Sequence, residues 1–134
     1  MPEIEHLNPP GLPRPSGYSH ATRAGDLVFV GGQVGCDAGG RILQPGDVAA
    51  QFALAVRNLR TALEAAGCRP DQVVKITYLV TDAAAYRGAL KAVGHAYREV
   101  FGRHYPASTL VEVKGLFDPA AMVEIECIAV RQPT

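Results

Sequence analysis

The chain has 134 residues, of which 48% are hydrophobic and 19% are charged, so it can bury the core of one domain and is too apolar for a disordered chain. Thirteen Lys and Arg balance thirteen Asp and Glu, which argues against a nucleic-acid partner, because proteins of that class carry an excess of positive charge. No apolar run reaches the length of about 18 residues that a membrane-spanning helix needs, and the N-terminus lacks a signal-peptide pattern. We therefore expect a cytoplasmic protein with no membrane partner.

The cysteines and histidines do not predict a metal site or a cofactor. The three cysteines show no Cys-x-x-Cys spacing, and the four histidines are scattered along the chain. Metal ligands need convergent spacing. We therefore expect reduced thiols, no bound metal and no cofactor.

The first part of the chain predicts an irregular arm followed by a hairpin. Residues 1–17 are interrupted by many prolines and glycines from position 9 onward, which is typical of irregular structure. Residues 18–24 are expected to form a strand, and Gly25-Asp26 is a hairpin turn signal. Residues 27–30 are then the second strand of the hairpin.

Two amphipathic helices follow. Asp47 is a good N-cap for the first, in which apolar residues recur every three or four positions until Gly67 ends the helix. Residues 73–80 are rich in β-branched side chains and predict a strand. Asp82 caps the second helix, and Gly102 ends it. The last two strands are expected at 108–113 and 122–130.

The resulting order, ββαβαββ, predicts a single α+β domain over residues 1–134. Two amphipathic helices cover one face of a mixed sheet of five or six strands. The opposite face still carries apolar positions but has no helix to cover it. Packing that face against other copies of the chain is the simplest way to bury it.

Short motifs in a fixed order link the chain to a known family. They are Tyr18-Ser19-x-Ala21, Val28-Phe29-Val30-x-Gly32-Gln33, Gln51, Asn58-Leu59, Ala65-Ala66-Gly67, Val74-Lys75-x-Thr77 with Asp82, Tyr105-Pro106-Ala107, and Glu124-Ile125-Glu126 with Ala129. No single motif is specific, but their order and spacing together are. Over residues 18–130 the chain resembles the Rid family, also called the YjgF or reactive-intermediate-deaminase family.

The resemblance implies a fold, an assembly and a chemistry. The family's fold is similar to that of chorismate mutase, and its members form homotrimers whose sheets pack into a central barrel. Small-molecule sites lie in the clefts between subunits. The best-studied branch hydrolyses reactive enamines and imines, such as 2-aminoacrylate, to 2-keto acids and ammonia. In that branch an Arg grips the substrate carboxylate, and a Glu of the last strand positions the attacking water.

Three residues of this chain match positions at the family's site. Glu124 matches the water-positioning Glu, and Tyr18 matches an N-terminal Tyr whose hydroxyl orients the ligand. The backbone N–H of Gly32 is a candidate donor to the ligand. Each residue also has a structural alternative: a carboxylate bonded to backbone for Glu124, an edge-packed aromatic for Tyr18, and a bulge or a positive-φ turn for Gly32. Glu126 lies on the same face as Glu124 and is expected to make an interface or rim hydrogen bond.

Three departures from the deaminase branch weaken the match. Ser108 stands after Tyr105-Pro106-Ala107, where that branch has Arg, and a hydroxyl cannot replace the two charge-assisted hydrogen bonds of a guanidinium. Gly94 replaces a common Asn, and Gly31 replaces a usual Ser. Ser108 and Gly94 remain candidate ligand-binding residues, with Ser108 expected to bond a neutral group.

Three functions stay open at this point. The first is a hydrolase acting on an imine, an enamine or a related carbonyl compound through water positioned by Glu124. The second is a non-catalytic trimer that binds a metabolite and acts in regulation, which the missing Arg favours. The weakest is an endoribonuclease, because the zero net charge and the lack of a basic, aromatic-laced surface argue against RNA binding. The residues do not specify the substrate.

Overall fold

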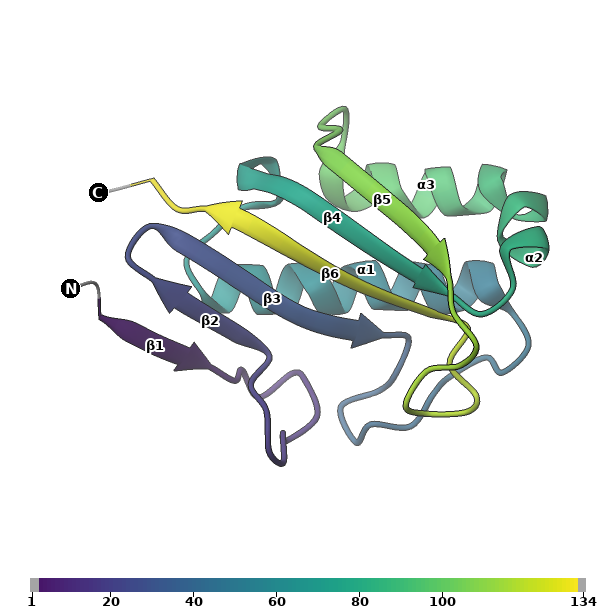
Figure 1. The fold of residues 1–134 in the computed structure, drawn as a ribbon, viewed down its shortest axis with the longest axis horizontal. Helices are drawn as coiled ribbons and strands as arrows, with labels where there is room; N and C mark the ends of the chain where they lie inside the picture. The colour runs from purple at the N-terminus through teal and green to yellow at the C-terminus, as the bar shows by residue number, and fades with distance from the viewer. Residues whose placement is uncertain (1–2, 133–134) are drawn as a thin grey trace.

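A six-stranded mixed sheet with helices on one face makes up the protein (Figure 1). This architecture comes from a computed structural model that describes residues 3–132. The strands are β1 (Ile4–Leu7), β2 (Ala21–Ala24), β3 (Leu27–Val34), β4 (Val73–Val80), β5 (Ala107–Glu112) and β6 (Val123–Val130). The helices are α1 (Val48–Ala65), α2 (Ala83–Gly88) and α3 (Leu90–Phe101), with a 3-10 turn, η1 (Pro70–Gln72), before β4.

The sheet has the order β1-β2-β3-β6-β4-β5, and only β4 and β5 are parallel neighbours. The last strand is therefore central, between β3 and β4. Helices α2 and α3 form the crossover that joins the parallel pair. In Figure 1 the helices lie behind the sheet, so the face toward the viewer is free of helices. This arrangement confirms the predicted α+β fold.

Three details differ from the sequence-based expectation. Residues 1–17 were expected to be irregular, but β1 pairs with β2, and Glu5 forms a 2.7 Å ion pair with Arg23 across the two strands. The proline-rich stretch begins at Pro9, after β1 ends. The expected second helix is divided into α2 and α3, because Ala89 leaves the helical conformation (φ −108°, ψ 10°) directly after Gly88. Strand β3 continues to Val34 through a bulge.

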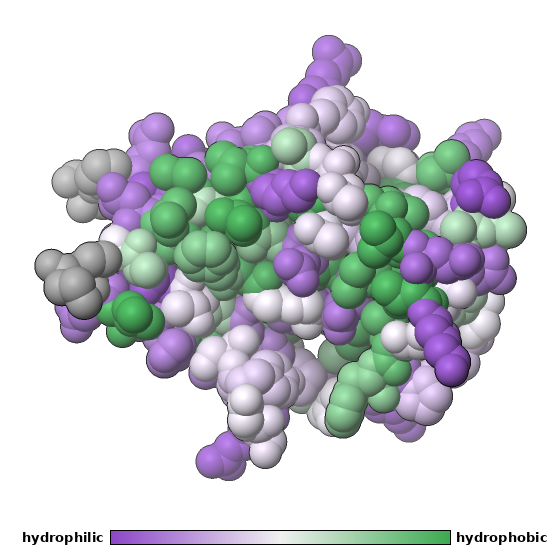
Figure 2. All heavy atoms as spheres, in the orientation of Figure 1, coloured by the Kyte–Doolittle hydropathy of each residue, from purple (hydrophilic) through white to green (hydrophobic). Residues whose placement is uncertain are grey.

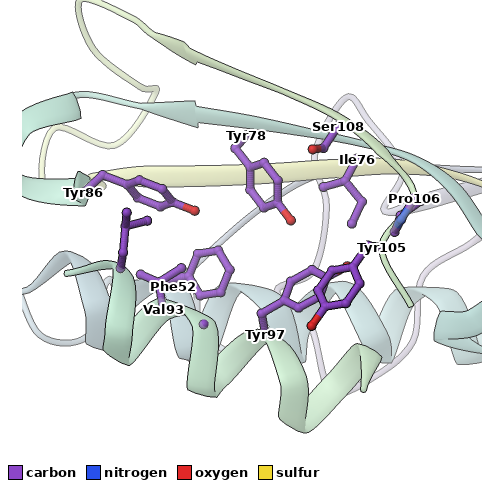
Figure 3. Close-up of a pocket in the computed structure, with 11 residues that line it drawn as sticks. Phe52, Ile76, Tyr78, Tyr86, Val93, Tyr97, Tyr105, Pro106 and Ser108 are labelled. Atoms are coloured by element: carbon purple, nitrogen blue, oxygen red, sulfur yellow. The ribbon is translucent and has the colours of Figure 1, made fainter. Parts of the chain in front are cut away.

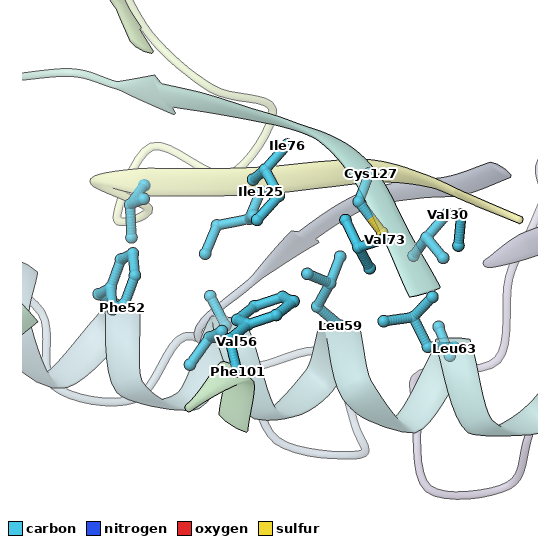
Figure 4. Packing of buried hydrophobic residues seen from close by; sticks show 14 of the residues in the cluster. Val30, Phe52, Val56, Leu59, Leu63, Val73, Ile76, Phe101, Ile125 and Cys127 are labelled. Atoms are coloured by element: carbon cyan, nitrogen blue, oxygen red, sulfur yellow. The ribbon is translucent and has the colours of Figure 1, made fainter. Parts of the chain in front are cut away.

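Helix α1 begins and ends as predicted. The Asp47 side chain accepts a hydrogen bond of 3.0 Å from the backbone N–H of Ala50, and Gly67 takes a positive φ of 83° just beyond the helix. One buried face of the helix supplies much of the core. Phe52, Leu59 and Leu63 pack there against side chains from β3, β4 and β6 (Figure 4).

Removing the α1 cap should destabilise the protein without unfolding it. In Asp47→Ala the N–H of Ala50 loses its partner, and N-cap substitutions of this kind cost about 1 kcal/mol. The measurement is urea denaturation at a fixed protein concentration. Glu64→Ala, an exposed change on the same helix, serves as the control and should stay within about 0.5 kcal/mol of wild type.

Side chains of β6 divide between the two faces of the sheet. Val123, Ile125, Cys127 and Ala129 are buried beneath the helices, so Glu124, Glu126, Ile128 and Val130 point to the open face. Both glutamates therefore share a face, as expected.

The open face is apolar over its middle strands. Exposed hydrophobic side chains on this face are Ile4, Leu27, Phe29, Val111 and Val130, each 39–63% accessible. Figure 2 shows hydrophobic surface over β3, β4 and β6, interrupted by polar side chains. Within the described residues no helix is both long and apolar enough to cross a membrane.

Candidate functional site

Three of the predicted site residues line one cavity, at the end of β3 and the beginning of β6. This cavity, the Glu124 pocket, has a volume of about 680 Å³. Its lining includes Tyr18, Gly32 and Glu124, and its other charged side chains are Arg14 and Asp118. The structure thus brings together residues that are more than 100 positions apart in the sequence.

Gly32 gives the Glu124 side chain its space. The β3 strand bulges between Val30 and Gln33, and a Cβ atom built on Gly32 would lie 2.5 Å from the carboxyl carbon of Glu124. The bulge was one of the expected alternatives, whereas the positive φ was not found at Gly32. Glycine therefore lets the Glu124 carboxylate lie directly over the backbone, and a larger residue would force that side chain to move.

The Glu124 carboxylate is half-buried between apolar neighbours. Its sheet partners are Val34 on β3 and Leu79 on β4. Burial raises the pKa of Glu124, and the nearby Glu126 raises it further. Across residues 3–132 Glu124 has no ion-pair or hydrogen-bond partner from its own side chain. It is therefore free to bond a ligand or a water molecule in the pocket.

The raised pKa predicts that stability and turnover respond to pH in opposite directions. Between the usual carboxyl value of 4.5 and the raised value, the folded chain keeps a proton that the unfolded chain has released. The free energy of unfolding therefore falls as pH rises through this window. If the ionised form accepts the proton of water, turnover rises through the same window. Denaturation curves and kcat/KM measured against pH test both trends, and turnover that falls across the window would contradict the assignment.

A hydrogen-bonded relay fixes the N-terminal loop over the pocket. Buried Gln33 donates from Nε2 to the carbonyl of Gly31 (3.2 Å) and to Nδ1 of His20 (3.1 Å). His20 Nδ1 is then the acceptor, so its Nε2 carries the proton and donates to the carbonyl of Pro13 at 2.6 Å. Tyr18, 56% exposed, packs edge-on to His20 with ring centroids 5.4 Å apart. The relay thus links the bulge to the loop that carries Tyr18.

Neither Gln33 nor His20 was predicted to act at the site. Gln33 belonged to a family motif without an assigned role, and His20 was grouped with the scattered histidines. No local pattern pairs residues that lie 13 positions apart, so only the fold reveals the contact. In the described part of the chain, no group of three potential metal ligands forms.

The other two predicted residues line a different cavity. Ser108 on β5 and Gly94 on α3 border a pocket of about 250 Å³ between α3 and the β4–β5 pair (Figure 3). This cavity, the aromatic pocket, is also lined by Phe52, Ile76, Tyr78, Tyr86, Leu90, Val93, Tyr97, Tyr105 and Pro106. Ser108 pairs with buried Ile76 and lies on the helix side of the sheet, whereas Glu124 faces the open side. One chain alone therefore does not place all five residues around one ligand.

The polar motif residues of α1 are structural supports. The Gln51 side chain is fully buried and bonds backbone groups of Gln44, Ala120 and Met122. Asn58 donates to the carbonyls of Val34 (2.9 Å) and Cys36 (3.1 Å). Both amides tie α1 to the segments that enter and leave the Glu124 pocket.

Comparison with known proteins identifies the family of the chain. The family described as Endoribonuclease L-PSP matches residues 12–131. The chain belongs to this family, the YjgF or Rid family that its motifs indicated. Among its relatives, a RutC family protein of Pyrococcus horikoshii is 33% identical, over 90% of this chain and 92% of the relative. A rat protein named 2-iminobutanoate/2-iminopropanoate deaminase is 35% identical, over 87% and 81% of the two chains.

Solved structures of the family show the same fold. The YjgF gene product of E. coli superimposes with a TM-score of 0.81 at 30% identity, covering 96% of this chain and 99% of the other. E. coli TdcF with bound serine gives a TM-score of 0.80 at 28% identity, with the same coverage. The family description names a ribonuclease, whereas the name of the rat relative gives a deaminase, so the family match alone does not choose between the two activities.

Proposed function

We propose that this protein is a small-molecule hydrolase that adds water to an imine, an enamine or a related carbonyl compound. One observation carries the proposal: Glu124, a half-buried carboxylate with a raised pKa, lies in a cavity beside Tyr18 and Gly32 and has no hydrogen-bond or ion-pair partner among residues 3–132. A carboxylate whose pKa is raised in this way is suited to accept a proton from water. The rat deaminase among the relatives supports the reaction class.

In the proposed reaction, Glu124 removes a proton from a water molecule whose oxygen attacks the imine carbon. The C=N double bond opens to a carbinolamine, and the proton passes to nitrogen. The carbinolamine hydroxyl then gives its proton through Glu124 to the amine nitrogen while the C–N bond breaks, which leaves a carbonyl compound and ammonia. An enamine first tautomerises to the imine. The Tyr18 hydroxyl and the Gly32 backbone N–H orient the substrate, while Ser108 offers one neutral hydrogen bond.

The site is completed, in this proposal, by a second copy of the chain. Glu124 and Ser108 point to opposite faces of the sheet within one chain, and the open face is apolar and exposed. A homotrimer that packs through this face would place Ser108 of one subunit next to Glu124 of its neighbour. Light scattering coupled to gel filtration should give three times the 14.2 kDa of one chain; a monomer would contradict the assembly.

Keto-acid release from imines is the test of activity. An amino-acid oxidase generates 2-imino acids in situ, and semicarbazide traps them. The rate at which the carbonyl product is released is measured with and without the protein. The panel includes small, branched and aromatic imino acids and imines without a carboxylate. Catalytic acceleration on any member supports the proposal. No acceleration across the panel, together with saturable metabolite binding, would favour the non-catalytic binding protein that the loss of Arg suggests.

Restoring the missing cation should shift substrate preference. In Ser108→Arg a guanidinium returns to the position where the deaminase branch has one, and it can hold a carboxylate through two hydrogen bonds. We expect kcat/KM for 2-imino acids to rise about tenfold or more relative to imines without a carboxylate. Ser108→Thr, which keeps the hydroxyl, is the control. An unchanged ratio would show that position 108 does not contact the substrate carboxylate.

A further inference from the structure

Two departures from the family pattern meet in the aromatic pocket. Ser108 and Gly94 lie on different elements, β5 and α3, yet they line the same cavity. Each is smaller than the residue usual in the deaminase branch. Ser108 and Gly94 therefore leave more open space at this place than an Arg and an Asn would.

Gly94 has no backbone reason to be glycine. It lies inside α3 without a positive φ, and the nearest atom to a Cβ built there is the flexible end of Arg98, at 3.2 Å. Glycine weakens a helix interior relative to alanine. In the described structure, glycine at this position keeps the α3 wall of the pocket open and also leaves room for the end of the Arg98 side chain.

The walls of the pocket are aromatic and uncharged. Phe52 stacks on Tyr78 with ring centroids 6.0 Å apart, and Tyr97 stacks on Tyr105 at 5.6 Å with an angle of 8° between the rings. No Asp, Glu, Lys, Arg or His lines this cavity among the described residues; the charged end of Arg98 lies beside Gly94, but Arg98 lines a separate hollow on α3. Such walls suit a flat, neutral ring.

Two tyrosine hydroxyls in the pocket have no hydrogen-bond acceptor among the described residues. Tyr86 is only 9% exposed, and neither it nor Tyr78 makes a side-chain hydrogen bond within residues 3–132. Figure 3 shows both hydroxyls directed into the space between the sheet and α3. Burial raises the pKa of each phenol, so both stay protonated and able to donate. The Tyr97 hydroxyl, in contrast, already donates to the carbonyl of His104.

We infer that the aromatic pocket binds a neutral, ring-bearing compound whose carbonyl or hydroxyl oxygen accepts hydrogen bonds from Tyr78 and Tyr86. The inference rests on the proposed function, because Ser108 and Gly94 belong to its expected ligand site. It specifies the substrate: the part that enters the aromatic pocket is an uncharged ring, aromatic or otherwise cyclic. The open positions 94 and 108 give the ring its room.

Titration with acetophenone, an aromatic ketone, tests the inference by NMR of the ¹⁵N-labelled protein. Saturable shifts are expected at the amides of Gly94 and Ser108, whereas benzoate, of similar shape but charged, should produce none. Tyr86→Phe removes one donor and keeps the ring, and it should weaken binding about threefold to tenfold. Gly94→Leu fills the pocket and should abolish binding. Ala92→Leu, on the exposed side of α3 and outside the pocket, is the matched control and should bind as wild type does.

The outcomes separate this inference from the proposed function. Glu124→Gln should bind acetophenone normally even though it loses turnover, because glutamine keeps the shape of the side chain and Glu124 does not line the aromatic pocket of its own chain. If acetophenone gives no saturable shift, or if Gly94→Leu binds it as well as wild type, the inference is overturned while hydrolysis at Glu124 can still be observed. Equal binding of benzoate would also overturn it, since it would show that the pocket does not select neutral rings.

Discussion

Replacing Glu124 with Gln should abolish hydrolysis and leave the protein folded. Glutamine has nearly the same shape, but it cannot accept a proton from water, and removal of a general base typically lowers turnover by about 10²-fold to 10⁴-fold. Folding should not suffer, because the carboxylate has no protein partner to lose within the described residues. Above the usual carboxyl pKa the variant should be at least as stable as wild type, since it no longer buries a charge.

Glu126→Gln is the matched control for this experiment. Glu126 lies on the same strand and face, but it is exposed and does not line the Glu124 pocket. Its amide variant should keep most of the activity. Turnover that survives in Glu124→Gln, or that is lost equally in both variants, would remove Glu124 from the role of base. Equal circular dichroism spectra and equal molecular mass confirm that any loss is chemical.

The parts of the fold that the sequence predicted well are those with local chemical signals. Helix α1 has an Asp cap, a regular apolar spacing and a glycine end, and β4 has a run of β-branched residues bounded by Pro70 and Asp82. The break between α2 and α3 was missed because the apolar stripe continues from Tyr86 to Leu90 across it. Strand β1 has only four residues, and its pairing with β2 depends on a contact that is distant in sequence.

The site was predictable as far as the family motif extends. Tyr18, Gly32 and Glu124 do meet in one cavity, although their chemical roles stay predictions. The sequence did not show why position 32 is glycine, because the reason is the position of the Glu124 side chain, which comes from a strand far along the chain. The separation of Ser108 from Glu124 was also hidden, since it follows from which face of the sheet each side chain takes.

Replacing Gln51 with Leu should cause a large loss of stability. The buried amide donates to the carbonyls of Gln44 (3.2 Å) and Ala120 (3.1 Å), and its oxygen accepts from the N–H of Met122 at 2.8 Å. Leucine is similar in volume, so no cavity forms, but these buried backbone groups lose their partner. Each unsatisfied group costs about 1–3 kcal/mol, and we expect the free energy of unfolding to fall by about 2–5 kcal/mol.

Urea denaturation at one protein concentration measures this loss, and an unchanged m-value would show that the unfolding reaction is the same. Arg57→Leu, an exposed change on the same helix, is the control and should stay within about 0.5 kcal/mol. Met122 immediately precedes β6, so the amide of Gln51 also sets the start of the strand that carries Glu124. Turnover in the folded fraction of Gln51→Leu should therefore fall as well. A variant as stable and as active as wild type would show that water replaces the amide without cost, and α1 would then hold the site by apolar packing alone.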